Sequence, residues 1–382
     1  MARFIVGAVA MVFAIALQPL LHPSLATPPQ LPPNVPAPSS SIPPCLQSCP
    51  KPRLFIPPAN RFSEGLASVM IVNQNAYQYG YIDPSGRVVI GPQFDYADDF
   101  SEGLAAVTIG AKSGYIDKTG RVVIQPLFTM PSSFSEGLAQ VKIGNKYGFI
   151  DKTGLIIIQP QFDFDQTDNF SEGLARVNIN EQWGFIDKTG KIAIAPQFQF
   201  ASPFSEGLAA VRIGGKWGYI DKTGNIIIEP QFYIASDFSE GLAGVSIGDQ
   251  WGYIDKTGNI VIKPQFDGAS GFKEGLALAT IDNKLNYIDK TGNIVIKPQF
   301  KYVSDFSEGL AVVTIGEKSG FINKTGKFVI EPKFQDASNF SEGLAAVEIG
   351  NQWGYIDKTG KIAIKPQFGF EREGLSLPPP RL

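Results

Sequence analysis

The feature that most constrains this chain is a short sequence, Phe-Ser-Glu-Gly-Leu-Ala, that recurs along most of its length. Successive copies start 34 residues apart, except that the first interval is 38 and the third is 36. In the seventh copy Lys273 replaces the serine. A fixed period of this length indicates that every copy folds into the same small unit and that neighbouring units cover one another. The nine copies begin at Phe62, Phe100, Phe134, Phe170, Phe204, Phe238, Phe272, Phe306 and Phe340.

Within one copy the pattern predicts three short β-strands. In the fifth copy these are residues 208–213, 216–221 and 225–230, the last rich in β-branched residues. The sequence Asp-Lys-Thr-Gly between the second and third strands predicts a turn, because glycine adopts the left-handed conformation and the Asp and Thr side chains can bond the turn's own backbone. The many glycines and the absence of a 3.6-residue period exclude a helical repeat. We therefore expect an all-β fold.

The pattern leaves two arrangements of the units open. We expect tandem three-stranded antiparallel meanders stacked as an open superhelical array, because nine or more units exceed the usual β-propeller. The alternative is a closed, propeller-like ring. Residues 53–57 resemble the repeat's final strand, and a partial tenth copy begins at Phe370, with Glu-Gly-Leu at 373–375. These two segments could complete a ring or cap the ends of an open array.

The first 26 residues have the composition of a secretory signal peptide. Arg3 precedes an apolar run over residues 4–17, and Ser24-Leu25-Ala26 fits a cleavage site. The alternative is an uncleaved membrane anchor, although Gln18 and Pro19 interrupt the run. We predict a periplasmic, secreted or cell-surface protein. The further divisions that we expect are a linker at 27–58, a repeat domain at 59–377 and a tail at 378–382.

The linker is dense in proline and serine and contains both cysteines of the chain, Cys45 and Cys49. In an oxidising compartment we favour a local disulfide between them, with an intermolecular link as the alternative. Their spacing does not suit a metal site. The only histidine is His22, inside the expected signal peptide, so histidine-dependent catalysis is excluded from the mature chain. The net charge of −3 predicts no broad basic face for nucleic acid.

The sequence Lys-Trp-Gly-Tyr-Ile-Asp-Lys-Thr-Gly at 216–224, followed by Pro-Gln-Phe and Ser-Glu-Gly-Leu-Ala, resembles the WG (or KWG) containing repeats of bacterial proteins. The resemblance extends from residue 62 to about 368 and implies an exported all-β scaffold without a general activity. Other residue types replace the tryptophan in five copies, and Asn286 replaces the following glycine in the seventh. We therefore assign structural roles to Trp183, Trp217, Trp251 and Trp353, and to Asp187, Asp221, Asp255 and Asp357.

The recurring carboxylates are the only candidates for catalysis. A glycosidase needs one pair of carboxylates in different environments. Here the same residues occur in nearly every copy, which argues against a single catalytic pair. Calcium would need a denser cluster of oxygen ligands than Asp-Lys-Thr-Gly offers. We therefore predict no enzyme, catalytic residue, cofactor or metal. The carboxylates are Glu102, Glu136, Glu172, Glu206 and Glu240, with Asp117, Asp151, Asp187, Asp221 and Asp255.

The positions that vary between copies are the candidate binding surface. In repeat scaffolds such positions often gather on one face, although neutral drift explains them equally well. We hypothesise an exported, non-enzymatic scaffold that binds an unknown protein or glycan. The alternatives are a carboxylate-only cell-envelope hydrolase or accessory module, for which the seventh copy with Lys273 and Leu285 is the first to inspect, and a structural spacer. The candidate surface residues follow Pro-Gln-Phe: Tyr96, Phe164, Phe200, Ile234 and Tyr302, with Gly268 at the same position.

Overall fold

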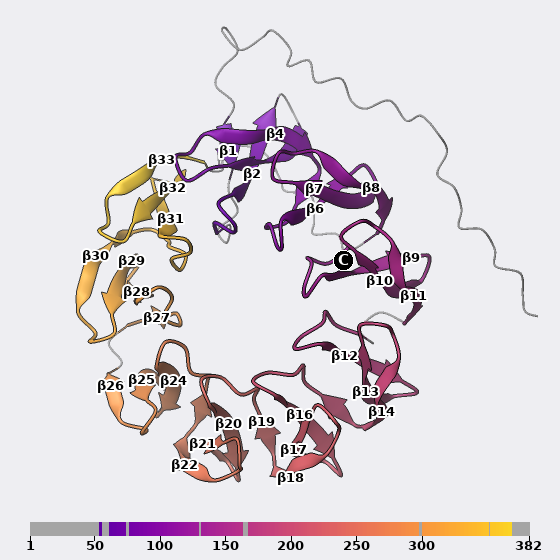
Figure 1. Ribbon diagram of the computed structural model, residues 1–382. Coiled ribbons are helices and arrows are strands. Elements are labelled where there is room, and N and C mark those ends of the chain that lie inside the picture. The colour runs from indigo at the N-terminus through magenta and orange to yellow at the C-terminus, as the bar shows by residue number, and fades with distance from the viewer. Residues whose placement is uncertain are drawn as a thin grey trace, which may run out of the picture. The chain divides into compact units, whose positions relative to one another are not determined.

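A computed structural model describes residues 53–55, 61–73, 76–129, 131–162, 167–297, 300–350 and 352–368. The expected signal peptide, nearly all of the expected linker with Cys45 and Cys49, the candidate Phe164 and the partial tenth copy lie outside the described residues. The chain divides into two units, Met1–Pro50 and Lys51–Leu382. The fold below is that of the second unit (Figure 1).

Every copy forms a small antiparallel sheet in which three strands follow one another in chain order. The first of the three are β2 (Ala67–Asn73), β6 (Leu104–Ile109), β9 (Leu138–Ile143), β12 (Leu174–Ile179), β16 (Leu208–Ile213), β20 (Leu242–Ile247), β24 (Leu276–Ile281), β28 (Leu310–Ile315) and β31 (Leu344–Ile349). The second are β3 (Ala76–Ile82), β7 (Lys112–Asp117), β10 (Lys146–Asp151), β13 (Gln182–Asp187), β17 (Lys216–Asp221), β21 (Gln250–Asp255), β25 (Lys284–Asp289), β29 (Lys318–Asn323) and β32 (Gln352–Asp357). The third are β4 (Val88–Phe94), β8 (Val122–Phe128), β11 (Ile156–Phe162), β14 (Ile192–Phe198), β18 (Ile226–Phe232), β22 (Ile260–Phe266), β26 (Ile294–Ile296), β30 (Phe328–Phe334) and β33 (Ile362–Phe368).

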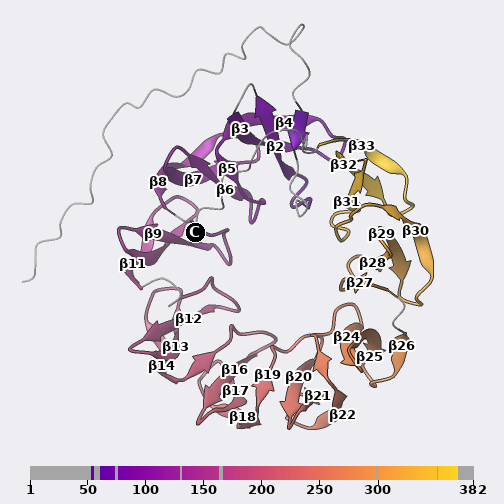
Figure 2. The same cartoon turned by 180° about the vertical axis from the view of Figure 1, so that it is seen from behind.

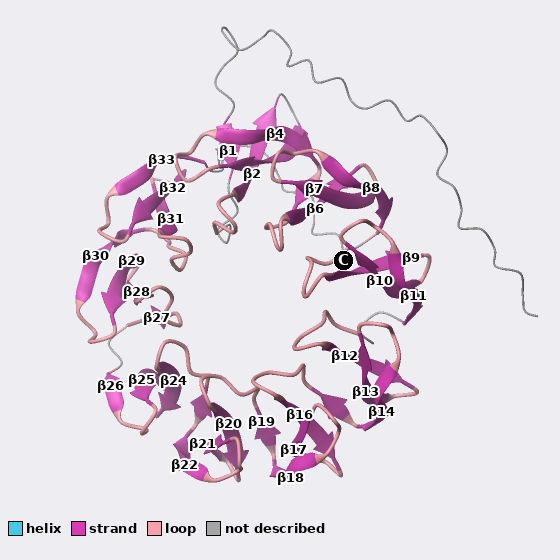
Figure 3. Ribbon diagram, in the orientation of Figure 1, coloured by secondary structure: helices cyan, strands magenta, loops and turns pink. Residues whose placement is uncertain are grey.

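Most sheets gain a fourth, very short strand that pairs with the first strand of the copy. In Figures 1 and 2 the short strands lie toward the centre of the unit, and the third strands, such as β30, form its outer edge. Figure 3 shows strands and loops only, and no helix of the described residues is long and apolar enough to cross a membrane. The short strands are β5 (Tyr96–Ala97), β15 (Phe200–Ala201), β19 (Ile234–Ala235), β23 (Gly268–Ala269) and β27 (Tyr302–Val303).

The hydrophobic cores lie between adjacent copies, and most of the first strands have buried side chains on both faces. In β16, Ala209 and Val211 pack into the core shared with the fourth copy, whereas Ala210 packs into the core shared with the sixth. Tyr219 belongs to the second of these cores, where its ring lies 4.8 Å from that of Phe238 and its hydroxyl donates to the carbonyl of Ser236 at 2.8 Å. Sheets that are buried on both sides cannot be stable as single units.

The cores also show that the array is closed. Nine copies in an open array would have eight junctions, but the structure has nine cores of this kind. The ninth joins Phe62 and Val69 of the first copy to Tyr355 and Ile364 of the last. In addition, β1 (Arg53–Phe55) pairs antiparallel with β2 and parallel with β33. The expected open superhelix is therefore wrong, and the alternative, a nine-bladed β-propeller, is confirmed.

The Trp-Gly motif sets the register of the second and third strands. A Cβ atom on Gly218 would lie 2.4 Å from the carbonyl oxygen of Ile228, so only glycine allows this approach. A bulge follows, and Trp217 then pairs with Phe232. In the seventh copy, where Asn286 has that Cβ, β26 ends at Ile296, and within the described residues Leu285 has no equivalent pairing.

Candidate functional site

Two sets of loops lie at opposite ends of the strands. Leu208, at the start of β16, pairs with Asp221, whereas Ile213, at its end, pairs with Lys216. A six-residue strand separates its two ends by roughly 20 Å. We call the end with the Glu-Gly and Asp-Lys-Thr-Gly turns the turn rim. The end with the loop between the first two strands, and with the segment after Pro-Gln-Phe, is the hairpin rim.

On the turn rim, each Ser-Glu-Gly-Leu sequence forms a two-residue hairpin turn. Glu206 has a φ of 54° and Gly207 a φ of 89°, the conformation of a type I′ turn. A glutamate in the left-handed region costs about 1 kcal/mol relative to the right-handed one. All nine glutamates adopt it: Glu64, Glu102, Glu136, Glu172, Glu206, Glu240, Glu274, Glu308 and Glu342. A strained conformation that recurs in every copy implies a compensating contact.

The compensating contact joins each copy to the next. Oε2 of Glu206 accepts a hydrogen bond from the backbone N–H of Gly241 at 3.0 Å and lies 3.1 Å from Nζ of Lys256. Partial burial opposes ionisation of Glu206, but the lysine and the N–H group outweigh it, so the pKa is lowered. The same hydrogen bond closes the ring, where Gly65 donates to Glu342 at 2.8 Å. These glutamates therefore connect the copies.

The junction between the last and first copies differs in one respect. The lysine that follows the aspartate in the other turns is replaced by Pro84. Among the described residues, Glu342 consequently has no lysine partner, whereas each of the other eight glutamates has one at 3.0–3.1 Å.

The aspartates of the turn rim bind their own turns. Oδ1 of Asp255 accepts hydrogen bonds from the hydroxyl and the N–H of Thr257, at 2.7 and 2.9 Å, and from the N–H of Asn259 at 3.0 Å. The hydrogen bond from the Thr257 side chain is the largest of the causes that lower the pKa of Asp255 to about 2. Asp187, Asp221 and Asp357 accept the same three hydrogen bonds. Within the described ranges, no three His, Cys, Asp or Glu residues are placed to hold a metal ion.

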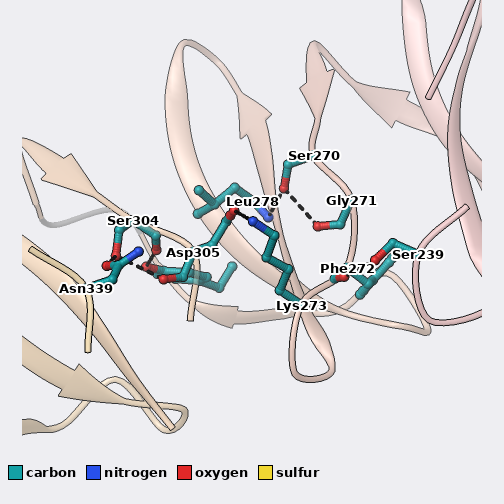
Figure 4. Close-up of polar contacts among 10 residues, drawn as sticks. Ser239, Ser270, Gly271, Phe272, Lys273, Leu278, Ser304, Asp305 and Asn339 are labelled. Atoms are coloured by element: carbon teal, nitrogen blue, oxygen red, sulfur yellow. Dashed lines mark hydrogen bonds and ion pairs between the residues drawn. The ribbon is translucent and has the colours of Figure 1, made fainter. Parts of the chain in front are cut away.

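The seventh copy departs from the pattern at Lys273. Elsewhere the serine hydroxyl donates to the phenylalanine carbonyl of the next copy, as Ser239 does to Phe272 at 2.6 Å. Figure 4 shows that Lys273 instead extends to Asp305 of the next copy, with 2.7 Å between Nζ and Oδ2. Glu274 nevertheless makes the usual contacts, with Gly309 at 3.0 Å and Lys324 at 3.1 Å. The carboxylate of Glu274 therefore has the same environment as those of most other copies.

The candidate surface residues lie on the hairpin rim. Tyr96, Phe200, Ile234 and Tyr302 are the first residues of the short strands, and their exposed fractions are 50%, 38%, 49% and 58%. Each of these residues pairs with the fifth residue of the first strand of its sheet. That fifth residue pairs in turn with the residue of the second strand that occupies the tryptophan position of the repeat. In the fifth copy this gives the row Phe200, Arg212 and Trp217. Gly268 has no side chain to offer.

Around the fifth copy, the aromatic side chains of this rim form a continuous group. The ring of Phe200 lies 5.6 Å from that of Trp183 and 5.4 Å from that of Trp217. The guanidinium of Arg176 lies over Trp183 and Phe200, at 4.7 and 5.3 Å, and also binds Asp168 and the carbonyl of Ala201. Trp251 is half-buried, and Trp353 is buried. The role of Arg176 was missed from sequence, although no other copy has arginine at its position.

Other copies have different chemistry at the same place. In the second copy Thr108 and Ser113 form a hydrogen bond at 2.9 Å, and in the eighth Thr314 and Ser319 do so at 3.1 Å. Tyr96 lies against Tyr79, and its hydroxyl donates to Asp98 at 2.8 Å. The hairpin rim is thus chemically uneven around the ring, while the turn rim is nearly uniform.

Several solved structures match the chain at low similarity. Dihydro-heme d1 dehydrogenase NirN in complex with DHE is 12% identical with a TM-score of 0.41, and the match covers 72% of this chain and 74% of that one. Hsv2 of Kluyveromyces lactis is 9% identical with a TM-score of 0.36, covering 58% and 90%. The extracellular domain of a putative hybrid two component system of B. thetaiotaomicron is 11% identical with a TM-score of 0.33, covering 83% and 56%.

No curated protein matches the chain. The family model described as "WG containing repeat" matches nine successive segments: 79–112, 114–147, 147–183, 183–217, 217–251, 251–284, 287–318, 320–353 and 353–370. These segments cover most of the repeats described above, and the gap between 284 and 287 leaves out Leu285 and Asn286 of the seventh copy. The chain therefore belongs to the WG containing repeat family.

Proposed function

We propose that this protein is an exported, non-enzymatic binding scaffold of the cell envelope, which presents its hairpin rim to a protein or a glycan. One observation carries the proposal: the turn rim is nearly identical in all copies because its side chains connect the copies, whereas the side chains of the hairpin rim vary and several are exposed. Variation concentrated on one rim of a regular repeat is typical of a binding surface. The N-terminal sequence supports export.

Catalysis is less well supported. The recurring glutamates are bonded to the next copy, and the recurring aspartates are bonded within their own turns. A general acid or nucleophile needs a carboxyl that can reach a substrate, with a pKa suited to its task. The low pKa of Asp255 does not suit a proton donor, and it reflects hydrogen bonds that hold the carboxylate in its own turn. A spacer is also less well supported, because a closed ring does not lengthen when a unit is added.

A pull-down from solubilised envelope fractions, and against a panel of polysaccharides, tests the proposal. The purified full chain serves as bait with and without calcium, beside a variant in which Phe200, Ile234 and Tyr302 are all changed to serine. A matched variant changes Lys222, Lys256 and Lys290 on the turn rim to glutamine. We expect saturable binding that the first variant loses and the second retains. Binding that survives in the first variant and is lost in the second would overturn the proposal, as would turnover of a defined substrate.

A further inference from the structure

The hairpin rim of the fourth to sixth copies combines aromatic rings with two cations, and of these rings Phe200 and Tyr233 are exposed whereas Trp183 and Trp217 are partly buried. We define the cationic aromatic sector as Trp183, Phe200, Arg212, Lys216, Trp217 and Tyr233. Its rings come from separate strands and loops: Trp183 from β13, Phe200 from β15, Trp217 from β17, and Tyr233 from the residue after β18. With centroid distances of 5.6 and 5.4 Å, the first three rings form one run.

Arg176 holds two of these rings in place. The side chain of Arg176 is only 19% exposed, and its guanidinium is fixed by Asp168 and by the carbonyl of Ala201, 2.7 Å away. It contacts Trp183 and Phe200, which belong to successive sheets. An arginine that is hydrogen-bonded at its edge and stacked on two rings limits the rotation of both. The run of rings is therefore preorganised, which lowers the entropic cost of binding a ligand to it.

The two cations of the sector have no carboxylate partner among the described residues. Arg212 is exposed and lies in register between Phe200 and Trp217. Nζ of Lys216 lies 3.1 Å from the centroid of the Tyr233 ring, whose side chain is 58% exposed. The equivalents of Arg212 in the second and eighth copies are threonines that bond to serine. Among the described residues, Lys142 of the third copy also lies over a ring, 5.6 Å from that of Tyr147, but Arg212 is the only guanidinium at this position of the rim.

We infer that the cationic aromatic sector binds an acidic glycan, with sugar rings against Phe200 and Trp217 and a carboxylate or phosphate group on Arg212. The inference rests on the proposed function and specifies its ligand. Aromatic side chains offer a flat apolar surface to the C–H faces of a sugar ring, and guanidinium binds an oxyanion through two parallel hydrogen bonds. A single-stranded nucleic acid has a charge on every nucleotide and needs a row of cations. Two cations without a carboxylate partner among the described residues, beside four rings, suit a more sparsely charged polymer.

Titration of the full chain with oligogalacturonate, followed by tryptophan fluorescence, tests the inference. The fully methyl-esterified oligomer is the matched neutral probe, because it keeps the sugar backbone and loses the charge. We expect the acidic oligomer to change the fluorescence of Trp183 and Trp217 and to bind at least about ten-fold more tightly than the ester, since one charge-assisted contact is worth roughly that much. Added salt should weaken the binding of the acidic oligomer.

Two variants locate the site. Arg212→Gln should weaken binding of the acidic oligomer about ten-fold and leave the ester unchanged. Lys263→Gln removes a charge that is also exposed, from the outer strand β22, and should change neither. Equal affinity for the acidic oligomer and the ester would overturn the inference, and so would tighter binding of a single-stranded DNA oligomer. If neither oligomer binds while envelope material is still captured through the hairpin rim, the inference fails and the proposed function stands. If the chain captures no envelope material at all, both the inference and the proposed function fail.

Discussion

The two rims of the propeller are built from the same strands but obey different constraints. On the turn rim, Glu206 is held in an unfavourable backbone conformation because its carboxylate binds the next copy. On the hairpin rim, Glu181 also has a positive φ, of 63°, but its side chain makes no hydrogen bond or ion pair among the described residues. The same residue type is therefore a connector at one end of the strands and a freely variable position at the other. Ring closure constrains only the contacts that cross between copies.

Acidification should act on the whole turn rim at once and have the largest effect. Partial burial is outweighed by lysine and N–H contacts at Glu102, so its folded pKa lies below 4.5. A lowered pKa contributes stability above the unfolded value and loses it as the pH falls through the folded value. We therefore expect the thermal midpoint to fall steeply below about pH 4.5. The same direction of shift holds for Glu64, Glu136, Glu206, Glu240, Glu274 and Glu308.

Three aspartates oppose this trend. Burial raises the pKa of Asp98, Asp99 and Asp237, so protonation favours the folded state at these positions. Calorimetry between pH 7 and pH 3 measures the balance. A midpoint that stays constant or rises on acidification would mean that the glutamate contacts contribute little to stability.

Glu206→Ala should lower the free energy of unfolding by about 2 kcal/mol. The substitution removes a charge-assisted hydrogen bond and keeps the left-handed strain. Glu206→Gly should cost less, because glycine relieves that strain. The matched control is Glu181→Ala on the hairpin rim, which should cost less than about 0.5 kcal/mol. Denaturant unfolding of the three variants measures the difference, and equal losses for Glu206→Ala and Glu181→Ala would show that the two rims do not differ.

Phe200→Ala should lower the free energy of unfolding by about 1 kcal/mol, because the ring is 38% exposed and yet contacts two tryptophans. Tyr302→Ala, at the same position of the eighth copy and 58% exposed, should cost about half as much. Thermal unfolding of both variants tests whether the hairpin rim tolerates substitution. A loss of about 3 kcal/mol, typical of a buried phenylalanine, would assign Phe200 to the core instead.

Lys222→Met should have the smallest effect, at most about 0.5 kcal/mol. The lysine side chain is 44% exposed in its pair with Glu172, so solvent and salt screen the interaction. The difference from the parent chain should vanish in 1 M salt, where the Debye length is about 3 Å. A loss that persists in high salt would point to packing of the lysine stem instead of charge.

Local patterns in the sequence predicted the unit, and the family match and the all-β architecture are confirmed. The Asp-Lys-Thr-Gly turn and the β-branched third strand depend on residues that are close in sequence, so the pattern determines them. Closure could not be derived in this way. It depends on the small rotation between neighbouring sheets, which accumulates over nine junctions and is set by packing of side chains such as Tyr219 and Phe238.

The role of the recurring glutamate was also beyond the local pattern, although a signal existed. A glutamate before glycine at the first position of a type I′ turn is unfavourable, and its presence in every copy called for a partner. The partner of Glu206 lies 35 residues away in the sequence, and the partner of Glu342 lies in the first copy, at the other end of the repeats. A pattern within one copy therefore cannot reveal either partner. The aromatic run was hidden for a related reason, since Trp183 and Phe200 lie in one copy of the sequence but in two different sheets.

Closure of the ring restricts how the number of copies can change during evolution. Tandem copies this similar are prone to unequal recombination, which deletes or duplicates one copy at a time. An open array would accept each such change at one end, but this ring must close again through Phe62 and Tyr355 with a different rotation at every junction. A gene that loses a single copy therefore risks a chain with no closed form, and selection should preserve the copy number more strictly than the identity of the residues on the hairpin rim.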